Sequence, residues 1–166
     1  MKNLKLIITS VITVTSFHYS AIAQSAIEHH VWQDARTFAP YSRTAEAITG
    51  KIKLSGNQEF ATPGSKMTIT FANGKKAQLT SVGASYRNWS DTNDKKLTAE
   101  IFKIAKDPGR LLNGNTLCGD NAKFIVFAED SSFGTALLSM AVFSSKTPPK
   151  DIASAGICAT FNYTVN

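Results

Sequence analysis

The sequence predicts an all-β fold, either an antiparallel barrel or a two-layer sandwich of seven or eight strands, with one disulfide and an N-terminal arm. Three observations support this class. Apolar and polar residues alternate in several runs, most clearly from Lys66 to Phe71, turn residues separate the runs, and no long helical pattern is visible. Both architectures bury one face of every strand, so the alternation alone does not choose between them.

The chain begins with the features of a secretory signal peptide. Lys2 and Lys5 precede the apolar run 6–14, and the small-residue triplet Ala21-Ile22-Ala23 is typical of a cleavage site. The apolar run is shorter than the ~18 residues that a membrane helix needs. We therefore expect residues 1–23 to be removed and the mature protein to be exported, soluble, to the periplasm or the extracellular space, with no membrane span.

The next segment, residues 24–44, is predicted to be an N-terminal arm packed on a single β domain of residues 45–166. It has room for a short helix from about Ala26 to Arg36, and Pro40 would end it. The pair His29-His30 does not predict a metal site, because adjacent side chains diverge and a zinc site needs three or four ligands. We expect two partly exposed histidines.

Four alternating runs define the first half of the β domain. Residues 45–54 form the first, and residues 66–71 and 76–82 form a hairpin whose Asn73-Gly74 turn favours positive φ angles. Residues 97–105 carry apolar groups on both faces, so this strand should cross the centre of the protein. The apolar positions of the first run are Ile48, Ile52 and Leu54.

Two cysteines, Cys118 and Cys158, lie 40 positions apart, and no others are present. In an exported protein such a pair predicts a disulfide, and the chain-entropy estimate for this loop is roughly 4 kcal/mol of stabilisation. Apolar runs 124–128 and 136–143 between them predict a hairpin, and residues 158–165 a last strand. We interpret this region as scaffold.

No common catalytic arrangement is present. The sequence lacks a Gly-x-Ser-x-Gly elbow, a His-Glu-x-x-His helix and a phosphate-binding loop, and bridged cysteines are not nucleophiles. Glu129 and Asp130 fall in the predicted hairpin turn, where solvent would leave their acidities ordinary, so they do not predict a glycosidase. We therefore expect a non-enzymatic protein with no cofactor and no metal.

The charge of the chain is mildly basic. Removing Lys2 and Lys5 lowers the formal net charge from +6 to +4. The doublets Lys75-Lys76 and Lys95-Lys96 lie beside turn residues instead of being concentrated on one element, so nucleic-acid binding is not predicted.

Residues 83–96 are polar and rich in turn residues, which predicts a loop. This loop would carry Tyr86 and Trp89, with Arg87 between them. Aromatic side chains on a polar loop are candidate contacts for a protein or envelope partner, although they could also fold back over the end of a barrel. We take Tyr86, Arg87 and Trp89 as the candidate binding residues.

Two resemblances add expectations. The blocks 43–50, 69–74, 111–119 and 158–163 resemble small exported proteins of alphaproteobacteria that have no established activity. This resemblance covers most of the mature chain and implies a periplasmic β-domain.

The second resemblance covers residues 67–89, which are similar to the middle of the periplasmic and membrane-bound inhibitors of c-type lysozyme. Those inhibitors are small β-barrels that plug the lysozyme cleft with a loop of Ser-Gly-x-x-Tyr type. Gly83 and Tyr86 fit this spacing, whereas Val82 replaces the serine, the following Lys-Gly loop is missing and the cysteines lie elsewhere. The resemblance implies that Tyr86 would enter an enzyme's cleft.

Three hypotheses for the function follow. The first is a non-catalytic exported domain that binds an envelope or extracellular partner, the second is the lysozyme inhibitor, and the third is a barrel that carries a small apolar ligand. A filled interior would exclude the third. The residues expected to fill it are Ile69, Leu79, Ile101, Phe124 and Leu138.

Overall fold

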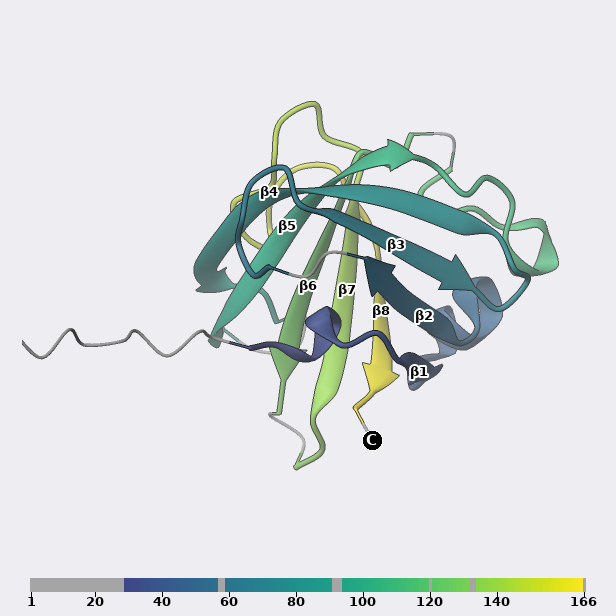
Figure 1. Cartoon of the computed structure of the whole chain (residues 1–166), viewed down its shortest axis with the longest axis horizontal. Coiled ribbons are helices and arrows are strands. Elements are labelled where there is room, and N and C mark those ends of the chain that lie inside the picture. Colours follow the sequence, from purple (N-terminus) through teal and green to yellow (C-terminus); the bar gives the residue numbers. More distant parts are fainter. Residues whose placement is uncertain (1–28, 57–58, 91–93, 120, 132–133, 166) are drawn as a thin grey trace, which may run out of the picture.

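Eight antiparallel strands follow one another in sequence order around a closed barrel (Figure 1). The computed structural model describes residues 29–56, 59–90, 94–119, 121–131 and 134–165, so the predicted signal peptide lies outside the described residues. The strands are β1 (Thr37–Pro40), β2 (Ile52–Gly56), β3 (Lys66–Phe71), β4 (Lys76–Asn88), β5 (Lys96–Lys106), β6 (Phe124–Asp130), β7 (Leu137–Phe143) and β8 (Ile157–Thr164). The all-β prediction is confirmed, and of the two predicted architectures the chain adopts the barrel.

Side chains fill the interior of the barrel. On β3, Met67, Ile69 and Phe71 point inward and are buried, while the residues between them face solvent, as the alternation predicts. The largest fully buried side chains of this core are Trp32, Tyr163, Phe38, Phe127, Phe161, Ile52, Leu54, Ile69, Leu79 and Leu117. The interior is therefore a packed core.

A second, smaller core lies on the outer face of β5, β6 and β7. Trp89 covers it and packs edge-on against Phe143, with 6.4 Å between the ring centroids. The connection between β7 and β8 adds Ile152, whose N–H donates to the carbonyl of Asn88 at 2.9 Å. The other members are Leu97, Ala99, Ile101, Phe124, Val126, Ala128 and Ala141.

This second core explains the apolar character of β5. Apolar residues are buried on both of its faces, because Phe102 points into the barrel and Ile101 into the outer core. The expectation that this strand crosses the centre of the protein is wrong, since β5 lies in the barrel wall between β4 and β6. The expected interior positions of Ile101 and Phe124 are wrong. Both lie in the outer core, since two apolar faces on one strand do not reveal which of them faces inward.

The N-terminal third differs from the prediction in two places. The expected arm contains β1, and in the described part of the expected helix, residues 29–36, the only helical element is the 3-10 turn η1 (Val31–Gln33). The first predicted strand starts too early, because Ala45–Thr49 form the single π-helical turn η2. β1 pairs with β8 at only two positions, so η2 packs beside β8 where the short strand ends.

Where η2 packs beside β8, the hydroxyls of Thr49 and Tyr163 share a hydrogen bond of 2.8 Å, and both residues are fully buried. Burial raises the pKa of the Tyr163 phenol well above its ordinary value, and the hydrogen bond to Thr49 only partly opposes this shift. The folded protein therefore keeps the phenol neutral at a pH where the unfolded chain ionises.

This shift predicts a loss of stability in alkali. Above the ordinary tyrosine pKa of 10.0, the folded state binds more protons than the unfolded state, so stability falls by up to ~1.4 kcal/mol per pH unit for this one group. Urea denaturation between pH 9 and about 11 should show that the free energy of unfolding falls less steeply with pH for Tyr163→Phe than for the wild type. The control is Tyr41→Phe, because Tyr41 is 58% exposed. Parallel profiles for all three proteins would contradict the prediction.

The predicted disulfide between Cys118 and Cys158 is confirmed, with 5.3 Å between the Cα atoms. Cys158 lies near the start of β8, and Cys118 lies in the long β5–β6 connection that contains the 3-10 turn η3 (Leu112–Gly114). The bridge therefore fixes the last strand of the barrel to the connection between β5 and β6.

Candidate functional site

One end of the barrel is sealed by the N-terminal segment and contains a buried carboxylate. Glu100 on β5 is only 2% exposed. Its Oε2 accepts a hydrogen bond from Trp32 Nε1 at 2.9 Å, and its Oε1 accepts one from Ser81 Oγ at 2.6 Å. Both carboxylate oxygens therefore have a donor inside the protein, as buried polar groups require.

The space beside Glu100 is small. A cavity of about 10 Å³ lies here, which is room for roughly one water molecule. Its lining residues are Trp32, Gln33, Glu59, Ser65, Met67, Glu100 and Phe102. Because no substrate-sized molecule fits, we interpret this end of the barrel as a structural seal.

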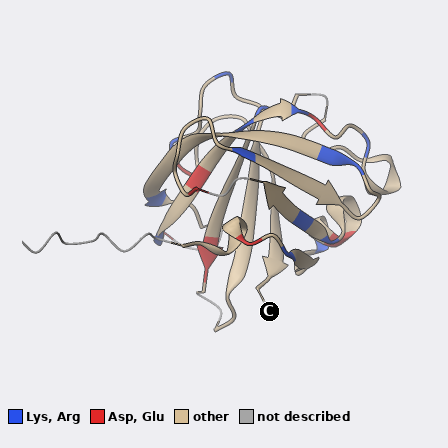
Figure 2. Cartoon of the chain, in the orientation of Figure 1, with Lys and Arg blue, Asp and Glu red and all other residues tan. Residues whose placement is uncertain are grey.

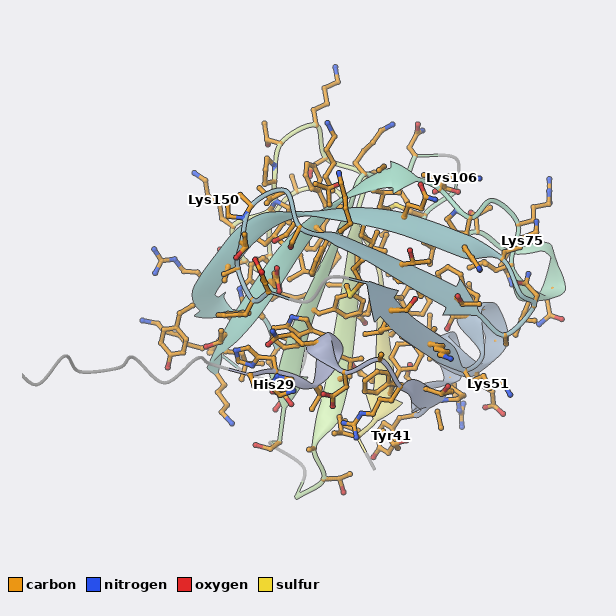
Figure 3. All side chains as sticks on the ribbon, in the orientation of Figure 1. His29, Tyr41, Lys51, Lys75, Lys106 and Lys150 are labelled. Carbon is orange, nitrogen blue, oxygen red and sulfur yellow. A yellow bond between two sulfur atoms is a disulfide. The ribbon has the colours of Figure 1, made fainter. Side chains whose placement is uncertain are left out.

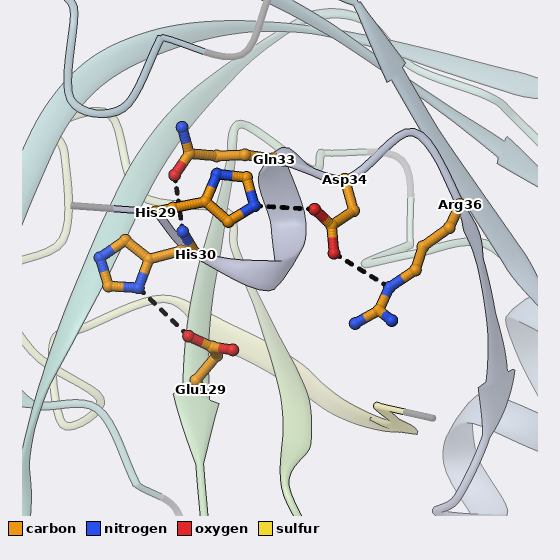
Figure 4. A network of polar contacts seen from close by, with 6 residues as sticks. All are labelled: His29, His30, Gln33, Asp34, Arg36 and Glu129. Carbon is orange, nitrogen blue, oxygen red and sulfur yellow. Dashed lines mark hydrogen bonds and ion pairs between the residues drawn. The ribbon is translucent and has the colours of Figure 1, made fainter. Parts of the chain in front are cut away.

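The two neighbouring histidines occupy different environments (Figure 4). His29 is exposed, and its Nε2 lies 2.8 Å from Asp34. His30 is buried, stacks on Trp32 with 4.3 Å between ring centroids, and its Nδ1 lies 3.2 Å from Glu129 Oε2. The expectation of two partly exposed histidines is therefore wrong for His30, which is part of the seal.

The acidic pair predicted at the tip of the β6–β7 hairpin lies in β6 instead. Asp130 is buried and accepts a hydrogen bond from Ser90 Oγ at 2.8 Å. Glu129 is partly buried beneath His30. The expectation of a solvated turn is therefore wrong, because the N-terminal segment and the residues after β4 cover these carboxylates.

A second feature of this region is a strand edge that is free on one side. β4 pairs with β3 from Lys76 to Thr80 and with β5 as far as Asn88. From Val82 to Arg87, no described strand pairs with β4 on the side away from β5. We call these six residues the β4 edge. The predicted loop over residues 83–96 is therefore wrong in its first half, which is strand.

A bulge marks the start of the β4 edge. The register with β5 shifts between Ser81 and Gly83, and Gly83 has a φ of 128°, which favours glycine. Beyond the bulge, Tyr86 is 62% exposed and Val82 is 39% exposed. The bulge thus precedes a short segment with an exposed aromatic side chain.

The structure separates the three candidate binding residues. Tyr86 and Arg87 lie on the β4 edge, and both are exposed. Trp89 is 2% exposed, and its Nε1 donates to Ser85 Oγ at 3.3 Å above the outer core. Trp89 therefore packs within the protein, which is the alternative that the sequence left open, and only Tyr86 and Arg87 are accessible to a partner.

Sequence reasoning missed Glu100, although a signal for it is present. Glu100 shares the inward face of β5 with Phe102. A carboxylate on an apolar strand face is a costly placement unless donors surround it. Its donors, Ser81 and Trp32, lie 19 and 68 positions away, so only the folded chain identifies them.

Comparisons with known proteins find no matching protein family, no matching curated protein and no matching solved structure. Among the described residues, no helix is long and apolar enough to cross a membrane. Within the same residues, no group of three or more potential ligands is placed to hold a metal ion. The function is therefore argued from the geometry of this chain.

Proposed function

We propose that this chain is a non-catalytic exported domain that binds an envelope or extracellular protein through the β4 edge. The observation that carries the proposal is the exposed Tyr86 on a strand whose outer side, from Val82 to Arg87, pairs with no other strand among the residues that the structure describes. Exposed edges are usually shortened, charged or covered, because they pair with other chains. An edge left open beside an exposed aromatic residue favours a docking role.

Strand addition is the binding mode that fits this edge. An extended segment of the partner would hydrogen-bond to those backbone groups of Val82–Arg87 that face away from β5. Tyr86 would contribute a large apolar surface with a polar tip, and Arg87 would contribute a charge. The β4 edge is held in place on its other side by continuous pairing with β5, so binding would order few new residues.

The packed interior supports contact on the outside of the barrel over transport within it. Ile69, Leu79 and Leu138 are at most 1% exposed and fill the core. A small apolar ligand would have to displace such side chains. The carrier hypothesis therefore receives no support from the geometry.

The test compares two exposed tyrosines. Wild type, Tyr86→Ala and Tyr41→Ala are used to capture partners from an envelope extract, and Tyr41 is a matched control because it is 58% exposed, against 62% for Tyr86. We expect Tyr86→Ala to weaken capture about tenfold or more, as for an aromatic hot spot, and Tyr41→Ala to leave capture unchanged. A partner retained equally by all three proteins, or no partner at all, would overturn the proposal.

The inhibitor remains the second candidate, and the exposure of Tyr86 is the observation that favours it. Here Gly83 to Tyr86 lie in a paired strand, so insertion into a cleft would use a strand edge and not a free loop. A clearing assay with c-type lysozyme uses the same three proteins. Inhibition by wild type and Tyr41→Ala, but not by Tyr86→Ala, would support this candidate, and unaffected clearing at excess protein would exclude it.

A further inference from the structure

The lysines located in strands are confined to one side of the barrel. They lie on β2 to β5, whereas β1 and β6 to β8 carry none. Figure 2 shows these basic segments along β2, β3 and β4. The strand lysines are Lys53, Lys66, Lys76, Lys96, Lys103 and Lys106.

Strand register arranges five of these lysines into rows that alternate with polar residues. In one row, Thr70 lies between Lys53 and Lys76, its partners on the two adjacent strands. In another row, Thr80 lies between Lys66 and Lys103. A strand spacing near 4.8 Å places the two lysines of each row about 10 Å apart.

A third row lies between these two and contains Ser55, Thr68, Gln78 and Lys106 in register. The Lys66 ammonium donates to Thr80 Oγ1 at 2.8 Å, so the hydroxyls and the charges of neighbouring strands are within contact distance. We call these three rows the lysine face.

No acid opposes these charges on the described strands. Glu100 is the one carboxylate within β2 to β5, and it points into the barrel, where Trp32 and Ser81 bind it. Asp107 lies at the margin, directly after β5. Figure 3 places Lys51, Lys75 and Lys106 on the same side of the molecule. The three rows therefore carry five lysines and no acidic residue, an arrangement that attracts anions.

The chemistry of the lysine face distinguishes among anionic polymers. The face has no aromatic residue in its three rows, whereas proteins that hold single-stranded nucleic acid stack its bases on aromatic side chains. It has no exposed large apolar side chain in those rows either, whereas peripheral membrane binding buries such groups. Its charges are lysines, not the arginines preferred for bidentate phosphate recognition.

We infer that the lysine face binds an acidic polysaccharide that carries carboxylate groups. The ammonium groups pair with the carboxylates, and the interleaved threonine, serine and glutamine side chains hydrogen-bond to sugar hydroxyls. The lysines and the hydroxyl-bearing side chains alternate along the rows, which matches a polysaccharide in which carboxylate and hydroxyl groups alternate. This inference goes beyond the proposed function, because the rows do not include the β4 edge.

The test uses polygalacturonate as the probe and the mature protein at low ionic strength, with calorimetry as the measurement. Lys66→Gln/Lys103→Gln removes one row. The matched control is Lys146→Gln/Lys150→Gln, which removes the same charge from exposed positions in the β7–β8 connection. We expect the row variant to bind about tenfold more weakly and the control to change less than about twofold, with added salt weakening all binding.

Four outcomes would overturn the inference. These are no binding to polygalacturonate, equal binding to neutral dextran, equal losses in both double variants, or tighter binding to phosphatidylglycerol vesicles or a single-stranded oligonucleotide. Thermal unfolding of each variant checks that the fold is intact. Tyr86→Ala should bind polygalacturonate as the wild type does, so failure of this inference and failure of the β4 edge proposal are distinguishable.

Discussion

Replacing Trp32 by alanine is expected to lower the free energy of unfolding by at least about 4 kcal/mol. Trp32 is 1% exposed, stacks on His30 and forms the seal of one barrel end. Alanine would leave a large cavity there. It would also remove one of the two donors to the buried Glu100, and an unsatisfied buried carboxylate costs further free energy.

Urea denaturation of the mature protein measures this loss, and a double-mutant cycle separates packing from hydrogen bonding. Trp32→Phe keeps an aromatic ring but has no N–H to donate to Glu100. We expect it to cost about 2 kcal/mol in the wild type and clearly less in a Glu100→Leu background, where no carboxylate needs a donor. An equal cost in both backgrounds would show that the bond from Trp32 to Glu100 does not stabilise the fold.

Removing the disulfide is expected to have the second large effect. The double variant Cys118→Ser/Cys158→Ser should lose about 3–4 kcal/mol of stability, because the bridge closes a loop of 40 positions and restricts the unfolded chain. The tether is important for β8, which closes the barrel against β1 through only two residue pairs.

Equilibrium denaturation in urea, with and without a reducing agent, checks this effect. The reduced wild type and the serine variant should unfold at the same urea concentration, and the reducing agent should not change the variant. A loss of less than about 1 kcal/mol in the free energy of unfolding would contradict the expectation. It would show that pairing with β7 holds β8 in place without the disulfide.

Local pattern was sufficient where a strand has one apolar and one polar face. The β3–β4 hairpin was predicted from alternation and its Asn73-Gly74 turn, and the structure pairs Thr70 with Lys76 across that turn. The disulfide was predicted from cysteine number and expected compartment. The hairpin depends on residues that are close in the sequence, and the disulfide was inferred from the number of cysteines, so both can be read from the sequence.

Long-range pairing decided the features that were predicted incorrectly. Residues 83–88 contain glycine, serine and asparagine, which favour turns, yet pairing with β5 holds them in an extended strand. Glu129 and Asp130 look like turn residues, but His30 and Ser90 cover them from distant parts of the chain. Tertiary contacts of this kind override local preference.

The candidate sites divide in the same way. The sequence named Tyr86, Arg87 and Trp89 together as candidate contacts and left open whether the aromatic side chains fold back. Burial of Trp89 depends on Phe143 and the outer core, which form only in the folded protein. The alternation of apolar and polar residues also predicts that each lysine of β2 to β5 is exposed, but it does not predict which lysines are neighbours. Register alone places Lys66 and Lys103 on either side of Thr80 and so forms the lysine face.

The sequence by itself determined an all-β domain with one disulfide, because the period of apolar residues and the cysteine count are local properties. The tertiary structure alone decided that the barrel closes, that its interior is filled and that no strand of the described residues pairs with the outer side of β4 from Val82 to Arg87. The physical reason is that strand pairing and register join residues far apart in the chain. In a strand with two apolar faces, such as β5, those partners set which face turns into the barrel.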